Sequence, residues 1–344
     1  MIQVFENLSI NLFLFSIINV ILIFFYSKLA HKFGLLDYPD YRKRHSGIIP
    51  LVGGLVIYTS LLIFYFQIST NYWIDIICVS STIIFVVGLI DDKKQIGIIV
   101  RLLAQIFACL LVMGVGLTIV DIGSYFDYSP LEVGIYGLLF TILCVVGLTN
   151  AINFMDGIDG LASGIILHAL VSILLFSYLD NGIQNSQILL YLIFSLIIFL
   201  VANLSPVLPK IFLGDSGSML IGFLVAWLLI YYSHPNVRAF HPVLTIWCVS
   251  IPTFDLLSVF TKRIIKKTNP FTPDRGHIHH LFINYGINAN VALTYIISLS
   301  IFFSLVGIIS YKILGSFYSL LIFWFCFILY LCISLLMDNK SKLE

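Results

Sequence analysis

Charged residues are scarce in this 344-residue sequence: Asp, Glu, Lys and Arg make up 10% of it, against 60% for hydrophobic residues. A soluble domain usually carries charge on about a quarter of its residues. A soluble fold would therefore have to hide too much apolar surface. The composition excludes an ordinary soluble domain and predicts a polytopic protein embedded in the lipid bilayer.

Two further features are missing. The net charge is only +1, so the chain has no basic field suited to nucleic acid. None of the six cysteines belongs to a Cys-x-x-Cys pair and all lie in apolar runs, so we expect them to act as small apolar residues.

The first apolar run, about 8–27, is followed by basic residues, and we expect a retained helix and not a cleaved signal peptide.

Apolar runs long enough to cross a bilayer as helices, about 20 residues each, recur along the whole chain. They predict an all-α fold of eleven transmembrane helices in a single domain covering 1–344, without internal repeats. The predicted spans are 8–27, 50–68, 74–90, 99–118, 133–149, 160–179, 187–203, 215–232, 242–261, 291–310 and 316–337.

The basic residues indicate the orientation. With eleven spans, 16 of the 18 Lys and Arg residues fall on one side, and only Arg238 and Lys312 fall on the other. Because Lys and Arg are enriched in cytoplasmic loops, this segregation predicts an N-terminus outside and a C-terminus inside. Adding or removing one span would scramble it.

The dense polar clusters all fall on this predicted cytoplasmic side. Asp91 and Asp92 directly follow an apolar run. Carboxylates are costly in hydrocarbon, so we expect both at the interface, at a helix end. Acids at a helix C-terminus oppose the helix dipole, which favours a functional pair over a plain topological stop.

The segment 150–160 reads Asn-Ala-Ile-Asn-Phe-Met-Asp-Gly-Ile-Asp-Gly. Asn153, Asp156 and Asp159 recur at every third position, which would place them near one face if the segment is helical. Oxygen ligands of this type suit Mg²⁺, which takes one or two carboxylates together with substrate phosphates. The alternative is an interfacial loop that uses Asp and Gly as turn formers.

Asp215 lies in Gly-Asp-Ser-Gly-Ser at 214–218, where another apolar span begins. It could cap the helix, or it could hold a metal where the helix N-terminus faces a phosphate.

Histidines close the longest polar loop, as His277, His279 and His280 after Arg275. Their spacing lacks the usual partners of a zinc site, so imidazoles near a pyrophosphate fit better, with a structural role as the alternative. Asp255 lies inside an apolar span, where an acid is a functional candidate by default unless it only pairs with a neighbour.

Arg44 and His45 precede a proline and a glycine pair at the entry to the second span. This basic, glycine-rich entry could bind a phosphate or anchor to anionic lipid.

Taken in order, these motifs resemble the polyprenyl-phosphate N-acetylhexosamine-1-phosphate transferases, glycosyltransferase family 4. The match runs from Arg44 to about Phe282 through Arg-His-Ser-Gly, Asp-Asp, Asn-x-x-Asn-x-x-Asp-Gly-x-Asp-Gly, Gly-Asp-Ser-Gly-Ser and His-Ile-His-His. The stretches 212–223 and 269–280 are most similar to the family members that use UDP-GlcNAc. One departure is Gln95, which stands where those members have a third acid.

The resemblance implies transfer of GlcNAc-1-phosphate from UDP-GlcNAc to undecaprenyl phosphate, with release of UMP, as the first step of O-antigen or other cell-surface polysaccharide assembly. It implies a multi-pass protein of the bacterial inner membrane whose active site faces the cytoplasm and uses Mg²⁺ or Mn²⁺. The implied roles are metal binding for Asp215, catalysis for Asp91, Asp92, Asp156 and Asp159, and substrate binding for Arg44, His45, Asn150, Asn153, Asp255, Arg275, His277, His279 and His280.

Two alternatives remain at this point. Another UDP-N-acetylhexosamine could be the donor. A cation-coupled transporter is the other alternative, but it would place carboxylates near mid-bilayer and show repeated halves, whereas only Asp255 lies deep in a span and no repeat is visible. The sequence does not set the oligomeric state, and a homodimer is one assembly that it allows.

Overall fold

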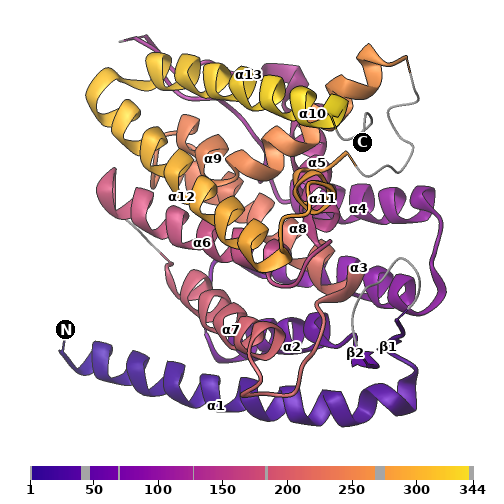
Figure 1. Ribbon diagram of the computed structural model, residues 1–344. Coiled ribbons are helices and arrows are strands. Elements are labelled where there is room, and N and C mark those ends of the chain that lie inside the picture. The colour runs from indigo at the N-terminus through magenta and orange to yellow at the C-terminus, as the bar shows by residue number, and fades with distance from the viewer. Residues whose placement is uncertain are drawn as a thin grey trace. The chain divides into compact units, whose positions relative to one another are not determined.

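The computed structural model describes residues 2–39, 47–68, 70–126, 128–182, 185–267 and 276–340, so Arg44, His45 and Arg275 lie outside the described ranges. The described chain is mostly helical (Figure 1). Its one ladder pairs strand β1 (Leu36–Asp37) with strand β2 (Ile49–Pro50) in antiparallel register. The prediction of an all-α fold is confirmed.

Contacts divide the chain into two compact units, each built from two stretches of sequence. The first unit joins Met1–Leu117 to Asn185–Trp227, and the second joins Thr118–Gln184 to Leu228–Glu344. The first unit contains α1 (Ile2–Phe33), α2 (Gly53–Gln67), α3 (Tyr72–Lys94), α4 (Ile98–Met113), α7 (Gln187–Leu204) and the first part of α8 (Gly214–Ser233). The second unit contains the rest of α8 with η1 (Gly134–Tyr136), α5 (Gly137–Met155), α6 (Leu161–Leu179), α9 (Val243–Cys248), α10 (Ser250–Ile265), α11 (Ile278–Asn284), α12 (Ala289–Leu314) and α13 (Ser316–Lys340).

Helices occupy all eleven segments predicted to span the membrane. Eight of the described helices are long and apolar enough to cross a bilayer: α1, α3, η1 with α5, α6, α7, α8, α12 and α13. The apolar helices α2 and α4 are shorter. The chain is a multi-pass membrane protein, while the count of eleven crossings and the orientation stay predictions.

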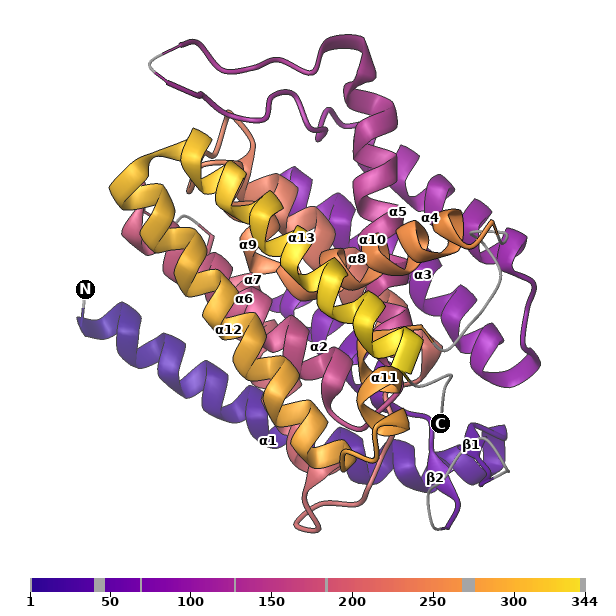
Figure 2. The same cartoon turned by 45° about the horizontal axis from the view of Figure 1, so that its top comes forward.

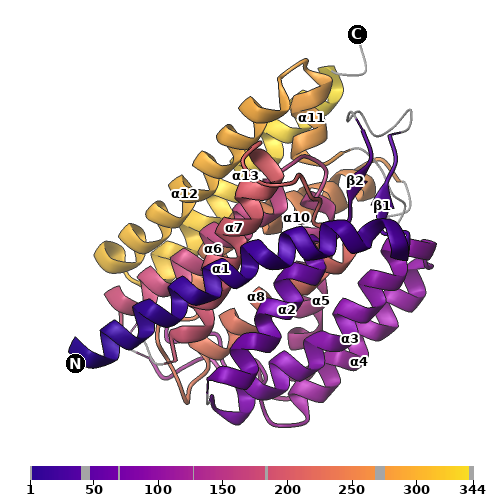
Figure 3. The same cartoon turned by 90° about the horizontal axis from the view of Figure 1, so that it is seen from below.

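In the first unit, α1 packs against α2 and α7 (Figure 3). Asn19 on α1 lies at their meeting point, where its side-chain oxygen accepts hydrogen bonds from Ser60 of α2 at 2.6 Å and Ser195 of α7 at 3.1 Å. Interhelical hydrogen bonds of this kind replace the hydrophobic driving force that helices lack inside lipid. Asn19 therefore links three helices through one amide oxygen.

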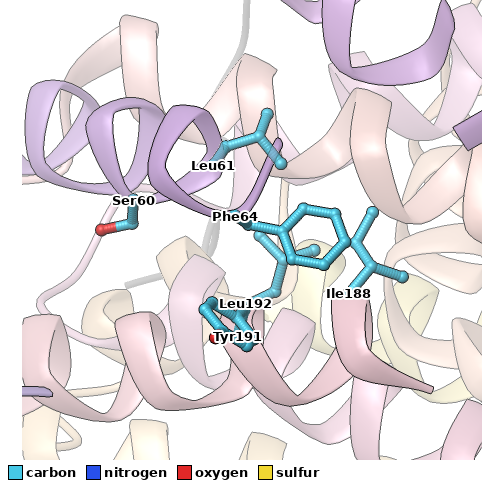
Figure 4. A pocket seen from close by; sticks show the side chains of 6 residues that line it. All are labelled: Ser60, Leu61, Phe64, Ile188, Tyr191 and Leu192. Atoms are coloured by element: carbon cyan, nitrogen blue, oxygen red, sulfur yellow. The ribbon is translucent and has the colours of Figure 1, made fainter. Parts of the chain in front are cut away.

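Next to this amide, α2 and α7 leave a small gap between them that is lined mainly by apolar side chains (Figure 4). The gap is too tight to admit a water molecule, so it is a packing seam and not a ligand cavity. Its lining residues are Ser60, Leu61, Phe64, Ile188, Tyr191 and Leu192.

The glycine pair at the start of α2 allows its backbone to contact the backbone of the segment before α8. The N–H groups of Gly53 and Gly54 donate to the carbonyls of Phe212 and Leu213 at 2.9 and 3.0 Å. A Cβ on Gly54 would lie 2.5 Å from the backbone nitrogen of Gly217, so a side chain is excluded there. These glycines hold the entry to α8, which leaves both N–H groups unavailable to a phosphate.

In the second unit, the predicted span 242–261 is divided into α9 and α10, with the break at Val249. Pro252 contributes to the break because it has no N–H to donate to the preceding turn. Ser304 of α12 donates to the carbonyl of Trp247 at 3.0 Å and so satisfies a backbone acceptor beside the break. Irregular backbone is tolerated at membrane depth where protein groups satisfy it in this way.

Residues 118–126 and 128–133 belong to a long loop that precedes η1 and α5 (Figure 2). Arg238 pairs with Asp121 at 2.6 Å, and the ring of His241 lies 3.0 Å from the carbonyl oxygen of Ser124. These contacts tie the loop to the segment that precedes α9.

The predicted orientation can be tested with exposed positions on the two predicted sides. Single cysteines replacing Lys94, Lys210 or Lys267 should resist an impermeant maleimide in intact cells, because these residues lie in predicted cytoplasmic loops. Cysteines replacing Tyr128 or Asn181 should be labelled without permeabilisation. The background lacks the six native cysteines, and labelling of the first three in intact cells would reverse the orientation.

Candidate active site

Asp91 and Asp92 lie in the last turn of α3 and bind different partners. Asp91 is buried, and its carboxylate accepts the N–H of Ile96 at 2.8 Å and pairs with Arg101 of α4 at 2.9 Å. Gln95, the residue in place of a third acid, ends the helix in the left-handed conformation with φ of 49°. Asp91 therefore closes the turn between α3 and α4.

Asp92 instead holds the first turn of α8. Its two carboxylate oxygens accept the N–H groups of Asp215 at 2.6 Å and Ser216 at 3.1 Å. A carboxylate satisfies the free N–H groups at a helix start and is stabilised by the helix dipole. An anion from the protein thus occupies the helix N-terminus that the sequence had suggested for a phosphate.

Two glycines make this approach possible. Gly214 has a φ of +72°, and a Cβ there would lie 2.8 Å from both carboxylate oxygens of Asp92. A Cβ on Gly88 of α3 would lie 2.5 Å from the Cα of Ser216. Gly214 belongs to the predicted motif, whereas Gly88 stands inside an apolar run, where sequence reasoning missed it.

The start of α8 is the predicted position of the Mg²⁺ ion. The described ranges contain no group of three or more His, Cys, Asp and Glu residues arranged to hold a metal. Mg²⁺ requires less from the protein, because waters and substrate phosphates complete its octahedral shell. Asp215, in the first turn of α8 and hydrogen-bonded through its N–H to Asp92, offers a carboxylate of the kind that this smaller requirement calls for.

In the second unit, the segment 150–160 is helical only in its first half. α5 ends at Met155, and 156–160 form the turn that leads into α6 through Gly160, whose φ is +77°. The interpretation that Asn153, Asp156 and Asp159 share one helical face is therefore wrong, and the alternative, a turn built from Asp and Gly, is confirmed for 156–160. Both aspartates are exposed on the turn instead, and Asn150 on α5 donates to the carbonyl of Val146 at 2.8 Å.

This turn packs against the histidine motif. A Cβ on Gly157 would collide with the ring nitrogen Nε2 of His279, so only glycine fits there. His279 is fully buried, and among the described residues neither of its ring nitrogens has a hydrogen-bond partner. Burial, helped by the neighbouring His280, lowers the pKa of His279 to about 3. His279 is therefore neutral at physiological pH and contributes as a neutral imidazole.

His277 lies just before α11, where its Nδ1 is 2.6 Å from a carboxylate oxygen of Asp255. The ring of Phe154 on α5 lies 5.2 Å from the His277 ring. His280 is partly exposed, and its ring centre is 4.1 Å from that of His279. The second unit thus brings together both histidine-rich and asparagine-aspartate motifs, although they are more than a hundred residues apart in sequence.

Comparison with known proteins identifies this arrangement of motifs. The model of the family "Glycosyl transferase family 4" matches residues 74–233, which run from α3 through α8. A protein of Yersinia pestis named undecaprenyl-phosphate alpha-N-acetylglucosaminyl 1-phosphate transferase is 31% identical over 93% of this chain and 89% of its own length.

Two further relatives extend this likeness. A protein of Escherichia coli K12 with the same name is 31% identical over 88% of this chain and 82% of its own length. A protein of Bacillus subtilis 168, named probable undecaprenyl-phosphate N-acetylglucosaminyl 1-phosphate transferase, is 31% identical over 86% of this chain and 83% of its own length. With similarity of this extent along nearly the whole sequence, the chain belongs to glycosyl transferase family 4.

Proposed function

We propose that this protein transfers GlcNAc-1-phosphate from UDP-GlcNAc to undecaprenyl phosphate. The observation that carries the proposal is the ordered set of polar motifs at helix ends, in a chain whose relatives are named for this reaction over nearly their whole length. We place the protein in the bacterial inner membrane with its site facing the cytoplasm, on the side where Lys and Arg gather. The family match does not favour the alternative of a cation-coupled transporter.

The reaction exchanges one diphosphate for another. An oxygen of undecaprenyl phosphate bonds to the β-phosphorus of UDP-GlcNAc, and the bond from that phosphorus to the bridging oxygen breaks. UMP leaves with this oxygen and its electron pair, and undecaprenyl-diphospho-GlcNAc forms. Phosphoryl transfer of this kind depends on positioning and charge neutralisation more than on covalent chemistry by the protein.

In the first unit, Asp215 would hold Mg²⁺ or Mn²⁺ at the start of α8, next to Asp92. The metal, when bound, supplies charge neutralisation at the diphosphate. Asp91 and Asp92 would position or deprotonate the lipid phosphate. A strong base is not needed, because the second pKa of a phosphate monoester is about 6.

In the second unit, the exposed carboxylates of Asp156 and Asp159 would line the nucleotide site, with Asn150 and Asn153 beside them on the last turns of α5. His279 and His280 would contact the diphosphate or the sugar. Because burial keeps His279 neutral, its contact would be a hydrogen bond and not an ion pair. We also assign substrate binding to the basic residues Arg44, His45 and Arg275, which lie outside the described ranges.

The donor is tested with purified protein and undecaprenyl phosphate. UDP-GlcNAc, UDP-GalNAc and UDP-MurNAc-pentapeptide are supplied in turn, and kcat/KM is measured from UMP release and lipid-linked product. We expect UDP-GlcNAc to be preferred. Preference for the pentapeptide donor would contradict the proposal, and product from another UDP-N-acetylhexosamine alone would reassign the sugar.

The metal site is tested by Asp215→Asn, which removes a charge with little change in shape. Activity should fall at least about tenfold even at saturating Mg²⁺, because a metal contributes several kcal/mol of charge stabilisation. The matched control is Asp75→Asn, since Asp75 is likewise an acid in the first turn of a helix and accepts a hydrogen bond from Thr70. Near-normal activity of the Asp215 variant would remove this residue from the metal site.

The acids at the end of α3 are tested by Asp91→Asn and Asp92→Asn. We expect turnover to fall on the order of tenfold or more while the affinity for UDP-GlcNAc stays near that of the wild type. Calorimetric binding and steady-state turnover separate the two quantities. Weaker nucleotide binding with unchanged turnover at saturation would move these residues to the donor site.

A further inference from the structure

Asp255 has a buried carboxylate, and described residues around it provide hydrogen-bond donors. Its side chain on α10 is 2% exposed. One oxygen lies 2.6 Å from Nδ1 of His277, and the other accepts the N–H of Ile278 at 2.8 Å and the hydroxyl of Tyr330 at 3.1 Å. A buried charge is tolerated when it is partnered in this way. Asp255 therefore has no open face for a substrate, although the sequence had suggested that it binds one.

The geometry at Asp255 fixes the state of His277. A carboxylate only accepts hydrogen bonds, so Nδ1 of His277 carries the proton that lies between them. The second ring nitrogen, Nε2, is then the ring nitrogen left to form a hydrogen bond with another group. The same relation between a buried aspartate and an imidazole sets the tautomer in serine hydrolases.

A buried lysine holds the residue that precedes His277. Lys262 on α10 is 3% exposed, and its Nζ donates to the carbonyl of Gly276 at 2.8 Å and to the hydroxyl of Ser334 at 2.9 Å. Asp255 thus binds the residue after His277, and Lys262 binds the residue before it. Tyr330 and Ser334 both belong to α13, which lies beyond the last motif of the chain.

We propose that Asp255 is a positioning residue for the transfer reaction, holding His277 so that Nε2 alone is offered to the substrate. Lys262 supports this arrangement by binding the carbonyl of Gly276, and Tyr330 and Ser334 of α13 bind Asp255 and Lys262. The last helix is then part of the positioning apparatus of the active site and not only a membrane anchor. This inference rests on the proposed function.

The substitution Asp255→Asn separates tautomer control from anchoring. The asparagine oxygen can still accept from Ile278 and Tyr330, but its amide group, in place of the other oxygen, would face Nδ1 of His277. The imidazole must then move its proton to Nε2 to accept from that amide. We expect kcat to fall about 100-fold, the range of a mispositioned acid-base group, with a smaller effect on KM for UDP-GlcNAc.

Hydrogen exchange of the segment 276–284 gives a readout that does not need substrate. Exchange should stay as in the wild type for Asp255→Asn, because the N–H of Ile278 keeps its acceptor. Tyr330→Phe keeps the carboxylate and removes one donor, so kcat should fall by about fivefold. The matched controls are Tyr285→Phe and Asp338→Asn, since Tyr285 donates to the carbonyl of Met337 and Asp338 pairs with Lys266, away from Asp255.

Each outcome decides the proposal. Lower kcat with unchanged exchange in Asp255→Asn, and near-normal controls, supports it. A kcat within about threefold of the wild type overturns it, and so does a lower kcat accompanied by faster exchange, which would make Asp255 a structural residue only. A wild-type protein that releases no UMP from any UDP-N-acetylhexosamine would refute the proposed function itself, and with it the role in transfer.

Discussion

The hydrogen bonds from the first turn of α8 to Asp92 fix the start of α8 against the end of α3 in the first unit. Helix starts leave N–H groups without partners, and inside a membrane protein each such group is costly. Asp92 satisfies two of them from the end of α3, and Gly54, Gly88 and Gly214 leave the space for this approach. The end of one apolar helix and the beginning of another are therefore joined through a carboxylate.

The same device recurs in the second unit. Asp255 accepts the N–H of Ile278 at the start of α11, as Asp92 accepts those at the start of α8. In the first unit, Asp91 likewise accepts the N–H of Ile96, which lies just after the end of α3. In each case an acid meets backbone N–H groups that no helix partner satisfies. These acids thus have structural partners in addition to any role in the reaction.

The apolar runs predicted the positions of the helices because lipid demands continuous apolar helices, and this demand is readable locally. The order of the motifs predicted the family for a similar reason, since each motif is a local pattern. The break at Val249 escaped prediction because it lies inside an apolar run with only Pro252 as a signal. For 156–160 the sequence left a helix and a turn as alternatives, because a three-residue spacing fits both.

The site as a whole was less readable than its motifs. Gly88 and Tyr330 stand in apolar spans, where a glycine or tyrosine looks like any other membrane residue. Their roles come from contacts with Ser216 and Asp255, residues more than seventy positions away along the chain. Such pairings depend on how helices pack, which a single sequence does not encode in its local pattern.

The contact between Gly157 and His279 limits how this protein can be recombined with its relatives. The turn and the histidine motif interlock so closely that neither surface can change shape alone. A chimera that takes 150–160 from one parent and 276–284 from another would pair two surfaces that were never fitted to each other. Exchange of both segments together keeps the interlock, so these two distant pieces of sequence form one transferable module.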